Sequence, residues 1–568
     1  MSEQNPATGA ATVAWAGPAG GALVEVSATG DAARAVAEQL PRLVEHGVAG
    51  RISRQDPTVW GPAAESEAAV RLGWTRLHET SRDLVEPLRE LRAELAAEGI
   101  DRVVLCGMGG SSLAPEVIAG TAGAQLVVLD ATHPDQIQRA LDGDLAATVV
   151  VVSSKSGSTV ETDSQRRAFE AAFTAAGIDP ASRIVVVTDP GSPLQQAAQE
   201  AGYRAVFEAD PNVGGRFSAL TAFGLVPAAL AGVDVEELLD EAAAVADVFA
   251  EDTEANPALV LGAALAGTSP LRDKIVISDA GSGLFHLGDW AEQLIAESTG
   301  KDQTGLLPVV ADAGAPELAE PVASDVLPVL LTALTDEPED GQPDESGGQS
   351  TEVTVAGALG GVFLLWEHAV AVAGQLLGIN PFDQPDVESA KAAARGLLES
   401  TPTPEPPAFT DSGVEVRTSS GLAAGATSVA EAVQALLDEL DGDRGYLAVM
   451  AYLDREGPAS TLLAGVRPGL ARRTGRPVTF GWGPRFLHST GQYHKGGPRV
   501  GAFLQITGTP SAVVDVPGRE FDFATLIAAQ AGGDAGVLAE LGRPVLRLHV
   551  TDQDALAWLA GVLTGPAA

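Results

Sequence analysis

Residues 102–112 (RVVLCGMGGSS) and residues 148–159 (TVVVVSSKSGST) decide the fold of this chain. Each stretch is a short apolar run, mostly β-branched, followed directly by a loop of glycine, serine or threonine. Such runs are typical of strands buried on both faces, as in parallel sheets covered by helices. A helical pattern follows each loop, over residues 113–120 and 160–175. The two stretches therefore predict neighbouring strand–loop–helix units of an α/β fold.

The same pattern recurs further along the chain. Residues 183–188 (RIVVVT) predict a third strand, and residues 274–278 (KIVIS) begin a second unit with the turn DAGSG and a helix over 290–298. The C-terminal third contains a predicted helix over 429–440 and predicted strands over 446–452, 501–507 and 545–550. We expect two related α/β domains with mainly parallel sheets, plus an elaborated C-terminal region. We expect an N-terminal extension over residues 1–64, a first domain over residues 65–245 and a second domain over residues 246–568.

Composition limits the class of protein. A chain of 568 residues with 45% hydrophobic residues suggests two or three folded domains. The net charge of −41 disfavours binding to nucleic acid or anionic lipid. No basic leader and no run of about 20 apolar residues is visible, and the single cysteine, Cys106, permits no internal disulfide. We expect a cytoplasmic protein with a solvated acidic insertion at 335–350 and a proline-rich connector at 401–407.

Two loops are candidates for binding phosphate. In residues 107–112 (GMGGSS), glycines allow close backbone approach, and the following helix start offers free N–H groups to an anion. Residues 153–159, here called the hydroxyl loop, carry five hydroxyl groups and Lys155. A helix cap needs only one hydroxyl, so five indicate a phosphate monoester. Loops that leave adjacent parallel strands meet at one crevice, which predicts a phosphorylated small molecule as ligand.

Six segments of this chain resemble the phosphoglucose isomerase family. They are GMGGSSLAP, SSKSGSTVET, VGGRFSALTAFGLVP, WAEQLIAESTGKDQTGLLPV, NPFDQPDVESAK and LHSTGQYHKGG, and they extend from residue 102 to about residue 507. The resemblance implies two sugar isomerase (SIS) domains, each an αβα sandwich, with the active site between them. It also implies interconversion of glucose 6-phosphate and fructose 6-phosphate through an enediol, with no metal or organic cofactor, in a homodimer.

The same resemblance implies a role for particular residues. The phosphate group would be held by the hydroxyl loop and the first glycine-rich loop, through Ser154, Ser156, Thr159, Gly110 and Ser111. Gln293 and Gln384 match substrate-binding glutamines. Glu297 matches the base that moves a proton between C1 and C2, and Arg216 would offset charge on the substrate oxygens. His488 and Lys391 would assist ring opening.

The histidine assignment has a competitor within its own segment. His488 and His494 both lie in LHSTGQYHKGG, and the family form LHxxGQ matches His488. His368, in an apolar run, is expected to lie in the core. The LHxxGQ segment follows NPFDQP by about a hundred residues, an order like that of the isomerase half of transaldolase–isomerase fusions. The hundred or so residues before the first loop are too few for a barrel of about 250 residues.

Two alternatives stay open. The enzyme could be a different SIS isomerase, acting on mannose 6-phosphate as well or on glucosamine 6-phosphate. A non-catalytic sugar-phosphate-binding regulator is the other, and it predicts a basic helix-turn-helix appendage without the Glu297 and Lys391 pair. The sequence shows neither of those two features.

Overall fold

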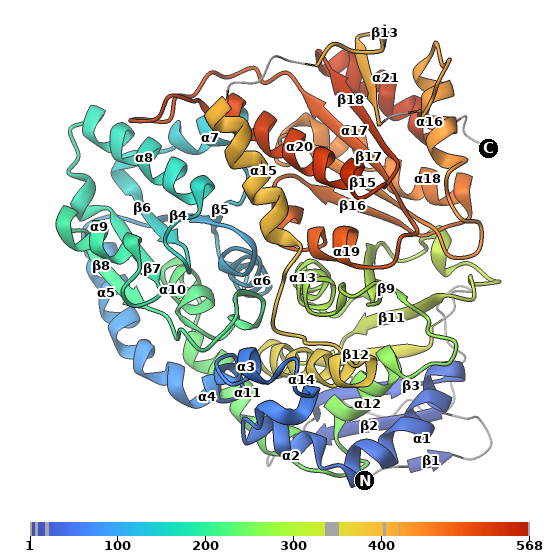
Figure 1. Ribbon diagram of the computed structural model, residues 1–568. Coiled ribbons are helices and arrows are strands. Elements are labelled where there is room, and N and C mark those ends of the chain that lie inside the picture. Colours follow the sequence, from blue (N-terminus) through green and yellow to red (C-terminus); the bar gives the residue numbers. More distant parts are fainter. Residues whose placement is uncertain are drawn as a thin grey trace.

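The computed structural model describes residues 3–5, 10–16, 22–334, 351–400, 405–419 and 421–565. The acidic insertion at 335–350 and the first half of the proline-rich connector, 401–404, lie outside the described residues. The described chain forms a five-stranded, a seven-stranded and a six-stranded sheet with helices packed around them (Figure 1). The predicted α/β class with mainly parallel sheets is confirmed.

The first sheet has the order β5-β4-β6-β7-β8 and is parallel throughout. Its strands are β4 (Arg102–Gly107), β5 (Val127–Leu129), β6 (Thr148–Ser153), β7 (Ile184–Thr188) and β8 (Ala205–Glu208). The covering helices include α5 (Val85–Ala97), α6 (Leu113–Thr121), α7 (Pro134–Leu141), α8 (Val160–Ala175), α9 (Pro193–Ala201) and α10 (Ala222–Ala231). β4 and β6 are almost wholly buried, which explains their unbroken apolar sequences.

The second sheet has the order β1-β2-β3-β12-β11-β9-β10. The strands β9 (Lys274–Ala280), β10 (Leu307–Ala311), β11 (Val326–Thr332) and β12 (Val353–Gly357) are parallel to one another. The N-terminal strands β1 (Glu3–Asn5), β2 (Ala10–Ala16) and β3 (Ala22–Ala28) extend this sheet in antiparallel pairs. The N-terminal extension thus contributes to a sheet formed about 250 residues later in the chain.

A third sheet is built from the C-terminal region alone, in the order β13-β14-β18-β17-β15-β16. Its strands are β13 (Phe409–Asp411), β14 (Val414–Thr418), β15 (Tyr446–Tyr452), β16 (Val478–Trp482), β17 (Gly501–Gly508) and β18 (Val545–Val550). Its helices are α16 (Val429–Leu437), α17 (Pro458–Leu463), α18 (Val466–Thr474), α19 (Gly491–Gly496), α20 (Phe523–Glu540) and α21 (Gln553–Thr564). The domain boundaries suggested by the sequence stay a proposal; within the proposed second domain, residues 246–568, the C-terminal region forms this sheet of its own.

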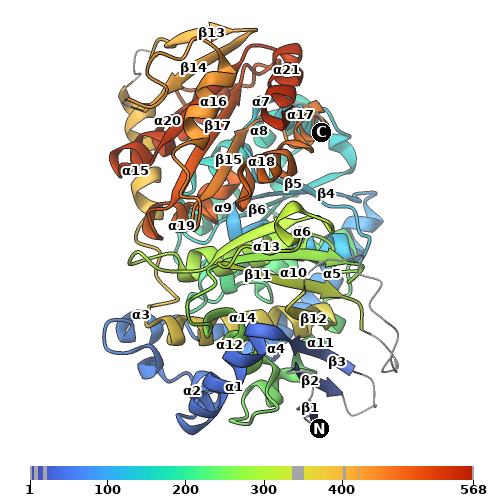
Figure 2. The ribbon, with the colours of Figure 1, turned by 90° about the vertical axis from the view of Figure 1, so that its right-hand side faces the viewer.

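Shared cores hold the sheets together. One cluster joins Val276 of β9 to Tyr446 of β15 and Ile527 of α20. Another joins Val104 of β4 to Phe523, also in α20. Figure 2 shows the C-terminal sheet above α13 (Leu287–Thr299) and β11, with the helical N-terminal region below. The three sheets therefore meet around α13 and α20.

The helix α14 (Leu359–Leu377) is the one described helix long and apolar enough to cross a membrane by length and composition. The sequence analysis expected no such run. Its apolar window is 89% buried inside the protein, against helices that include α11 (Val235–Phe249) and α12 (Pro257–Ala266). His368 of this helix is buried and its ring meets Trp74 edge-on, so its predicted place in the core is confirmed.

Candidate functional site

The two predicted phosphate-binding loops leave the carboxyl ends of adjacent strands, β4 and β6. The first contains the short helix η4 (Gly109–Ser111) and packs against η7 (Gly215–Phe217). A Cβ atom on Gly110 would overlap the carbonyl oxygen of Gly215, so this contact requires glycine. The loop backbone is thereby held next to Arg216, the second residue of η7.

The hydroxyl loop places its side chains in pairs. The hydroxyls of Ser154 and Thr159 lie 3.0 Å apart, as do those of Ser156 and Ser158. Thr159 is the N-cap residue of α8, yet its side chain makes no capping hydrogen bond. The hydroxyls are therefore not used as a helix cap, which is the arrangement expected of groups kept for a ligand.

Lys155 is the exception within this loop. Its ammonium lies 2.7 Å from the carboxylate of Asp189 and 3.5 Å from the carbonyl oxygen of Pro211. The structure brings Lys155 to this carboxylate and records no bond from it to the neighbouring hydroxyls. The positive charge that the sequence assigned to phosphate binding is balanced by Asp189 here.

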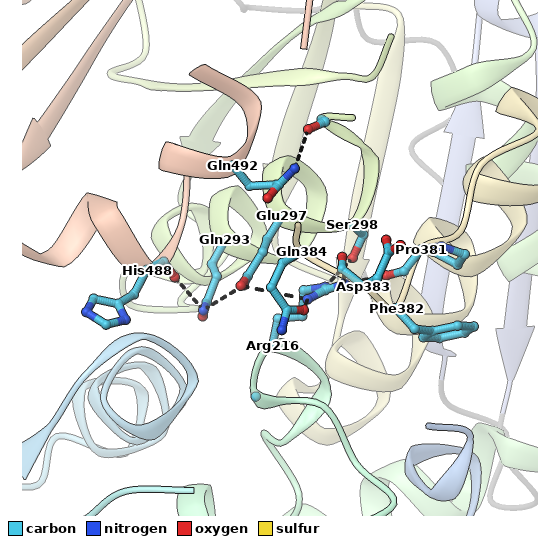
Figure 3. Close-up of polar contacts among 12 residues, drawn as sticks. Arg216, Gln293, Glu297, Ser298, Pro381, Phe382, Asp383, Gln384, His488 and Gln492 are labelled. Atoms are coloured by element: carbon cyan, nitrogen blue, oxygen red, sulfur yellow. Dashed lines mark hydrogen bonds and ion pairs between the residues drawn. The ribbon is translucent and has the colours of Figure 1, made fainter. Parts of the chain in front are cut away.

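A buried arginine organises the centre of the candidate site (Figure 3). Arg216 donates hydrogen bonds to the Ser298 hydroxyl at 2.8 Å and to the Gln384 side-chain oxygen at 2.9 Å. It also donates to the carbonyl oxygens of Pro381 and Asp383, at 2.6 and 3.1 Å. Burial lowers the pKa of its guanidinium below the usual value. These bonds fix the guanidinium plane and the loop around it.

The predicted base, Glu297, lies beside this arginine near the end of α13. Its Oε1 is 3.8 Å from Nη1 of Arg216, and its residue is only 8% exposed. Gln293, one helical turn earlier, donates to Glu297 at 3.2 Å and to the carbonyl oxygen of His488 at 2.7 Å. The side-chain oxygen of Gln293 is buried and has no hydrogen-bond partner among the described residues. The i, i+4 spacing thus places an amide and a carboxylate on the same helix face.

The segment 380–386, here called the anchored loop, is held by three further bonds. Lys301, 2% exposed, donates to the carbonyl oxygens of Asn380 and Asp383 at 2.7 and 2.6 Å, and to the Asp383 carboxylate at 2.7 Å. Burial, together with the positive charge of the nearby Arg216, lowers the pKa of Lys301 to about 8. Arg216 and Lys301 together fix the backbone that carries Gln384.

His488 contacts α8, a helix that covers the first sheet. Its Nε2 lies 3.2 Å from a carboxylate oxygen of Glu161, and the same oxygen accepts a 2.7 Å bond from Gln530. Gln530 in turn accepts a bond from Thr132. Glu161 lies in the first turn of α8, directly after the hydroxyl loop, and is buried. A carboxylate held in this way fixes the orientation of the imidazole.

The competing histidine, His494, lies in the core instead. It is 3% exposed, its Nδ1 is 3.0 Å from the Tyr446 hydroxyl, and its ring stacks on that tyrosine. Burial lowers the pKa of His494 well below its usual value. The geometry favours His488, as the sequence analysis did.

The structure says least about Lys391 among the predicted site residues. It belongs to α15 (Val387–Ser400), and its side chain lies outside what the structure describes. The helix begins just after the anchored loop. Asp386 there is held by Gln492, which accepts from its backbone N–H at 3.0 Å and donates to its carboxylate at 2.7 Å.

Three residues of the site had no role in the sequence analysis: Glu161, Lys301 and Gln492. Each lies inside a motif quoted above, in SSKSGSTVET, ESTGK and LHSTGQ respectively. Their bonds run to backbone groups or to residues more than 75 positions away. Their positions inside these motifs were the one signal in the sequence that could have marked them as site residues. Their bonding partners could be identified only from the folded structure.

The fold and these loops define a sugar-phosphate isomerase type of architecture, and comparisons with known proteins agree. A phosphoglucose isomerase family model matches residues 42–303. Glucose-6-phosphate isomerase of Synechococcus sp. (strain JA-3-3Ab) is 31% identical over 346 residues, which are 52% of this chain and 65% of that protein. The enzyme of Synechococcus sp. (strain JA-2-3B'a(2-13)) is 30% identical, over 54% of this chain and 68% of its own length.

A solved structure shares the fold. The crystal structure of a glucose-6-phosphate isomerase from Chlamydia trachomatis superposes with a TM-score of 0.52 at 19% identity, covering 66% of this chain and 89% of that one. The chain belongs to the phosphoglucose isomerase family. This chain covers slightly less than two thirds of the length of several of these relatives, including the enzyme of Synechococcus sp. (strain JA-3-3Ab).

Proposed function

We propose that this protein interconverts glucose 6-phosphate and fructose 6-phosphate by moving a proton between C1 and C2. The names of the relatives support the substrate, and the buried carboxylate beside a fixed arginine supports the reaction. A proton next to a carbonyl group is acidic enough for a carboxylate base when the resulting oxyanion is stabilised. The reaction so written uses no organic cofactor.

Phosphate binding is assigned to the two loops at the carboxyl edge of the first sheet. The paired hydroxyls of Ser154, Thr159 and Ser156 supply donors, and the backbone at Gly110 and Ser111 supplies N–H groups close to Arg216. The cleft beside the hydroxyl loop measures about 1610 Å³ and is lined by five arginines against four acidic residues. Four of these arginines are paired with Asp163 or Glu405, so the assignment rests on the donors of the two loops and not on the charge of the cleft.

Ring opening is assigned to His488, with Lys391 as a second proton donor. Glu161 holds Nε2 of His488, so the imidazole keeps one orientation while it accepts or returns a proton at a sugar oxygen. Glu297 then removes the C2 proton and returns it at C1. Arg216 offsets the negative charge that develops on the substrate oxygens during this step. Gln293 and Gln384 hold the substrate hydroxyls and Glu297 in register.

The single observation that carries the proposal is the position of Glu297, buried beside Arg216 and within reach of Gln293. Glu297→Gln keeps the shape and removes the base. We expect kcat to fall by about 10²–10⁴-fold with little change in KM, because phosphate recognition lies on other loops. Deuterium incorporation from solvent at C2 of glucose 6-phosphate should stop as well.

Glu292→Gln is the matched control, since it removes a carboxylate from the same helix away from Arg216. It should leave both measurements close to wild type. Retention of more than a tenth of wild-type kcat by Glu297→Gln, a loss of less than about 1.4 kcal/mol, would show that another group is the base.

Two finer points are proposals of the same kind. Activity on mannose 6-phosphate in a coupled assay decides whether the enzyme also acts on that sugar, and binding of fructose 6-phosphate without turnover would favour a regulator. We also propose a homodimer and a cytoplasmic location. Family membership supports both, and sedimentation and fractionation test them.

A further inference from the structure

The first and second sheets repeat one topology. In the first, the chain goes from β4 to β5 on one side and then to β6 on the other, giving the order β5-β4-β6-β7. In the second, it goes from β9 to β10 and then to β11, giving the order β10-β9-β11-β12. The strand order thus reverses at β4 and at β9. Such a reversal opens a crevice at the carboxyl ends of the strands, where α/β proteins bind ligands.

In the first sheet this crevice carries the loops assigned above to sugar phosphate. In the second sheet the equivalent place is a cavity of about 630 Å³, here called the second-sheet cavity. It is lined by Ser278 at the end of β9, Val310 of β10 and Leu331 of β11. Its volume lies in the range of small-molecule sites. None of the candidate site residues described above lines it.

The walls of the cavity are aromatic and apolar. Phe480 and Trp482 of β16 meet edge-on with ring centroids 5.1 Å apart, and Leu463 lies on the same side. Phe285, between β9 and α13, also lines the cavity. It is 48% exposed, and the His286 ring stacks on it with ring centroids 4.0 Å apart. The cavity therefore lies between the second and third sheets and offers flat apolar faces to a ring.

Three polar groups of the cavity have unused bonding capacity. Ser278 is 3% exposed at the cavity wall, and its hydroxyl makes no hydrogen bond among the described residues. Arg467, 8% exposed, binds Glu317 through Nη1 at 2.6 Å, whereas its Nη2 has no hydrogen-bond partner. The carboxylate of Asp312 is exposed and has no side-chain partner in the described part of the chain.

The charge of the lining differs from that of the first sheet. Asp279 and Asp289 line the cavity in addition to Asp312, whereas serine and threonine occupy the loops after β4 and β6. The Asp279 carboxylate accepts hydrogen bonds from the backbone N–H groups of its own turn, at Gly281 and Ser282. Three carboxylates repel a phosphate group and accept bonds from hydroxyls.

We propose that the second-sheet cavity binds a neutral small molecule that combines a flat face with hydroxyl groups, a free sugar or a nucleoside. The flat face packs on Trp482 and Phe285. Hydroxyl groups of the ligand donate to Asp312 and bond to the Ser278 hydroxyl. This site is independent of the proposed isomerisation, because it is defined by other residues and is tested by binding alone.

Calorimetric titration of the full chain tests the proposal with adenosine, AMP, maltose and maltose 1-phosphate. We expect adenosine or maltose to bind at one site per chain, and the phosphorylated form of that ligand to bind at least tenfold more weakly. Binding of adenosine alone identifies a nucleoside site, and binding of maltose alone identifies a sugar site. If neither binds up to 10 mM, or if the phosphorylated form binds as well, the proposal is wrong.

Variants locate the site. Ala464 lines the cavity and is exposed, so Ala464→Trp fills the space without touching the core and should abolish binding. Val513→Trp adds the same ring at a position 81% exposed, outside the cavity lining, and should bind like wild type. Ser278→Ala removes one hydroxyl and should weaken binding about tenfold, which keeps the test valid if Ala464→Trp does not fold. Unchanged binding in both cavity variants would place the ligand elsewhere.

Discussion

Replacing Lys301 by Met tests whether the anchored loop matters for catalysis or only for folding. Methionine keeps the length and apolar packing of the lysine stem and removes the ammonium. Three acceptors then lose the bond from Lys301: the carbonyl oxygens of Asn380 and Asp383, and the Asp383 carboxylate. The Asp383 carbonyl oxygen keeps its bond from Arg216. Gln384, which follows directly, receives a bond from Arg216. The loosened loop should therefore release one of the partners that hold the guanidinium beside Glu297.

The cost in stability follows from burial. Removing one partner of a buried ion pair costs about 3–5 kcal/mol, because the other charge stays behind. The side chain of Asp383 is 43% exposed and can be rehydrated, so we expect the lower end of that range, about 3 kcal/mol. The proposed phosphate-binding loops are separate from the anchored loop, so only the substrate contact assigned to Gln384 should affect KM. We expect a small rise in KM, whereas kcat should fall at least tenfold.

Lys274→Met provides the matched control. Lys274 is fully buried and pairs with Asp273 at 2.8 Å and Asp325 at 3.1 Å, but it begins β9, at the end of the strand away from the carboxyl edge. Its loss should cost at least as much free energy of unfolding, with kcat unchanged per folded molecule. Urea denaturation and steady-state kinetics at a temperature where both variants are folded separate the two effects. Equal kcat values for the two variants would refute a role of the loop anchor in catalysis.

Three other outcomes are expected. Replacing the three hydroxyl-loop residues (Ser154, Ser156 and Thr159) by Ala should raise KM for fructose 6-phosphate at least tenfold, and an unchanged KM would leave the loop a structural element. His488→Ala should slow turnover of the cyclic sugar far more than that of an open-chain analogue, and the reverse preference in His494→Ala would reassign ring opening. Burial raises the pKa of Glu292 to about 8, so the native state retains a proton that the unfolded chain releases near pH 4.3. The wild-type protein therefore loses stability as pH rises between these values. Glu292→Gln lacks this loss, so the difference in melting temperature between the variant and wild type should shift in favour of the variant from pH 5 to pH 8.

The parts of the fold that the sequence predicts well are those with strong local signals. β6 and β15 are unbroken apolar runs between turn residues, and the structure gives strands within one residue of the predicted bounds. α8 spans the predicted residues 160–175. The predicted helix over 429–440 ends earlier, at Leu437, because the last residues form a turn before β15. In each case the agreement reflects period and composition, which are properties of the segment itself.

Pairings between distant segments were not predictable in this way. β3 pairs with β12 across more than 300 residues, and nothing in residues 22–28 specifies that partner. Lys155 was expected to face a phosphate, and its ion pair with Asp189, at the end of another strand, was not predicted. The partner of a polar side chain depends on tertiary packing, which single-sequence patterns do not contain.

The order of motifs along the chain posed the main difficulty, and the structure supplies a physical reason why it need not affect the site. LHSTGQ follows NPFDQP by about a hundred residues, yet Gln492 donates to Asp386 at 2.7 Å and to Gly300 O at 2.9 Å. The intervening chain forms much of the third sheet, whose strand β16 ends just before His488. The shared core between β9 and β15 then holds that sheet against α13. A site residue needs a rigid element that delivers it to the crevice, and either chain order can supply one once the sheets share a core.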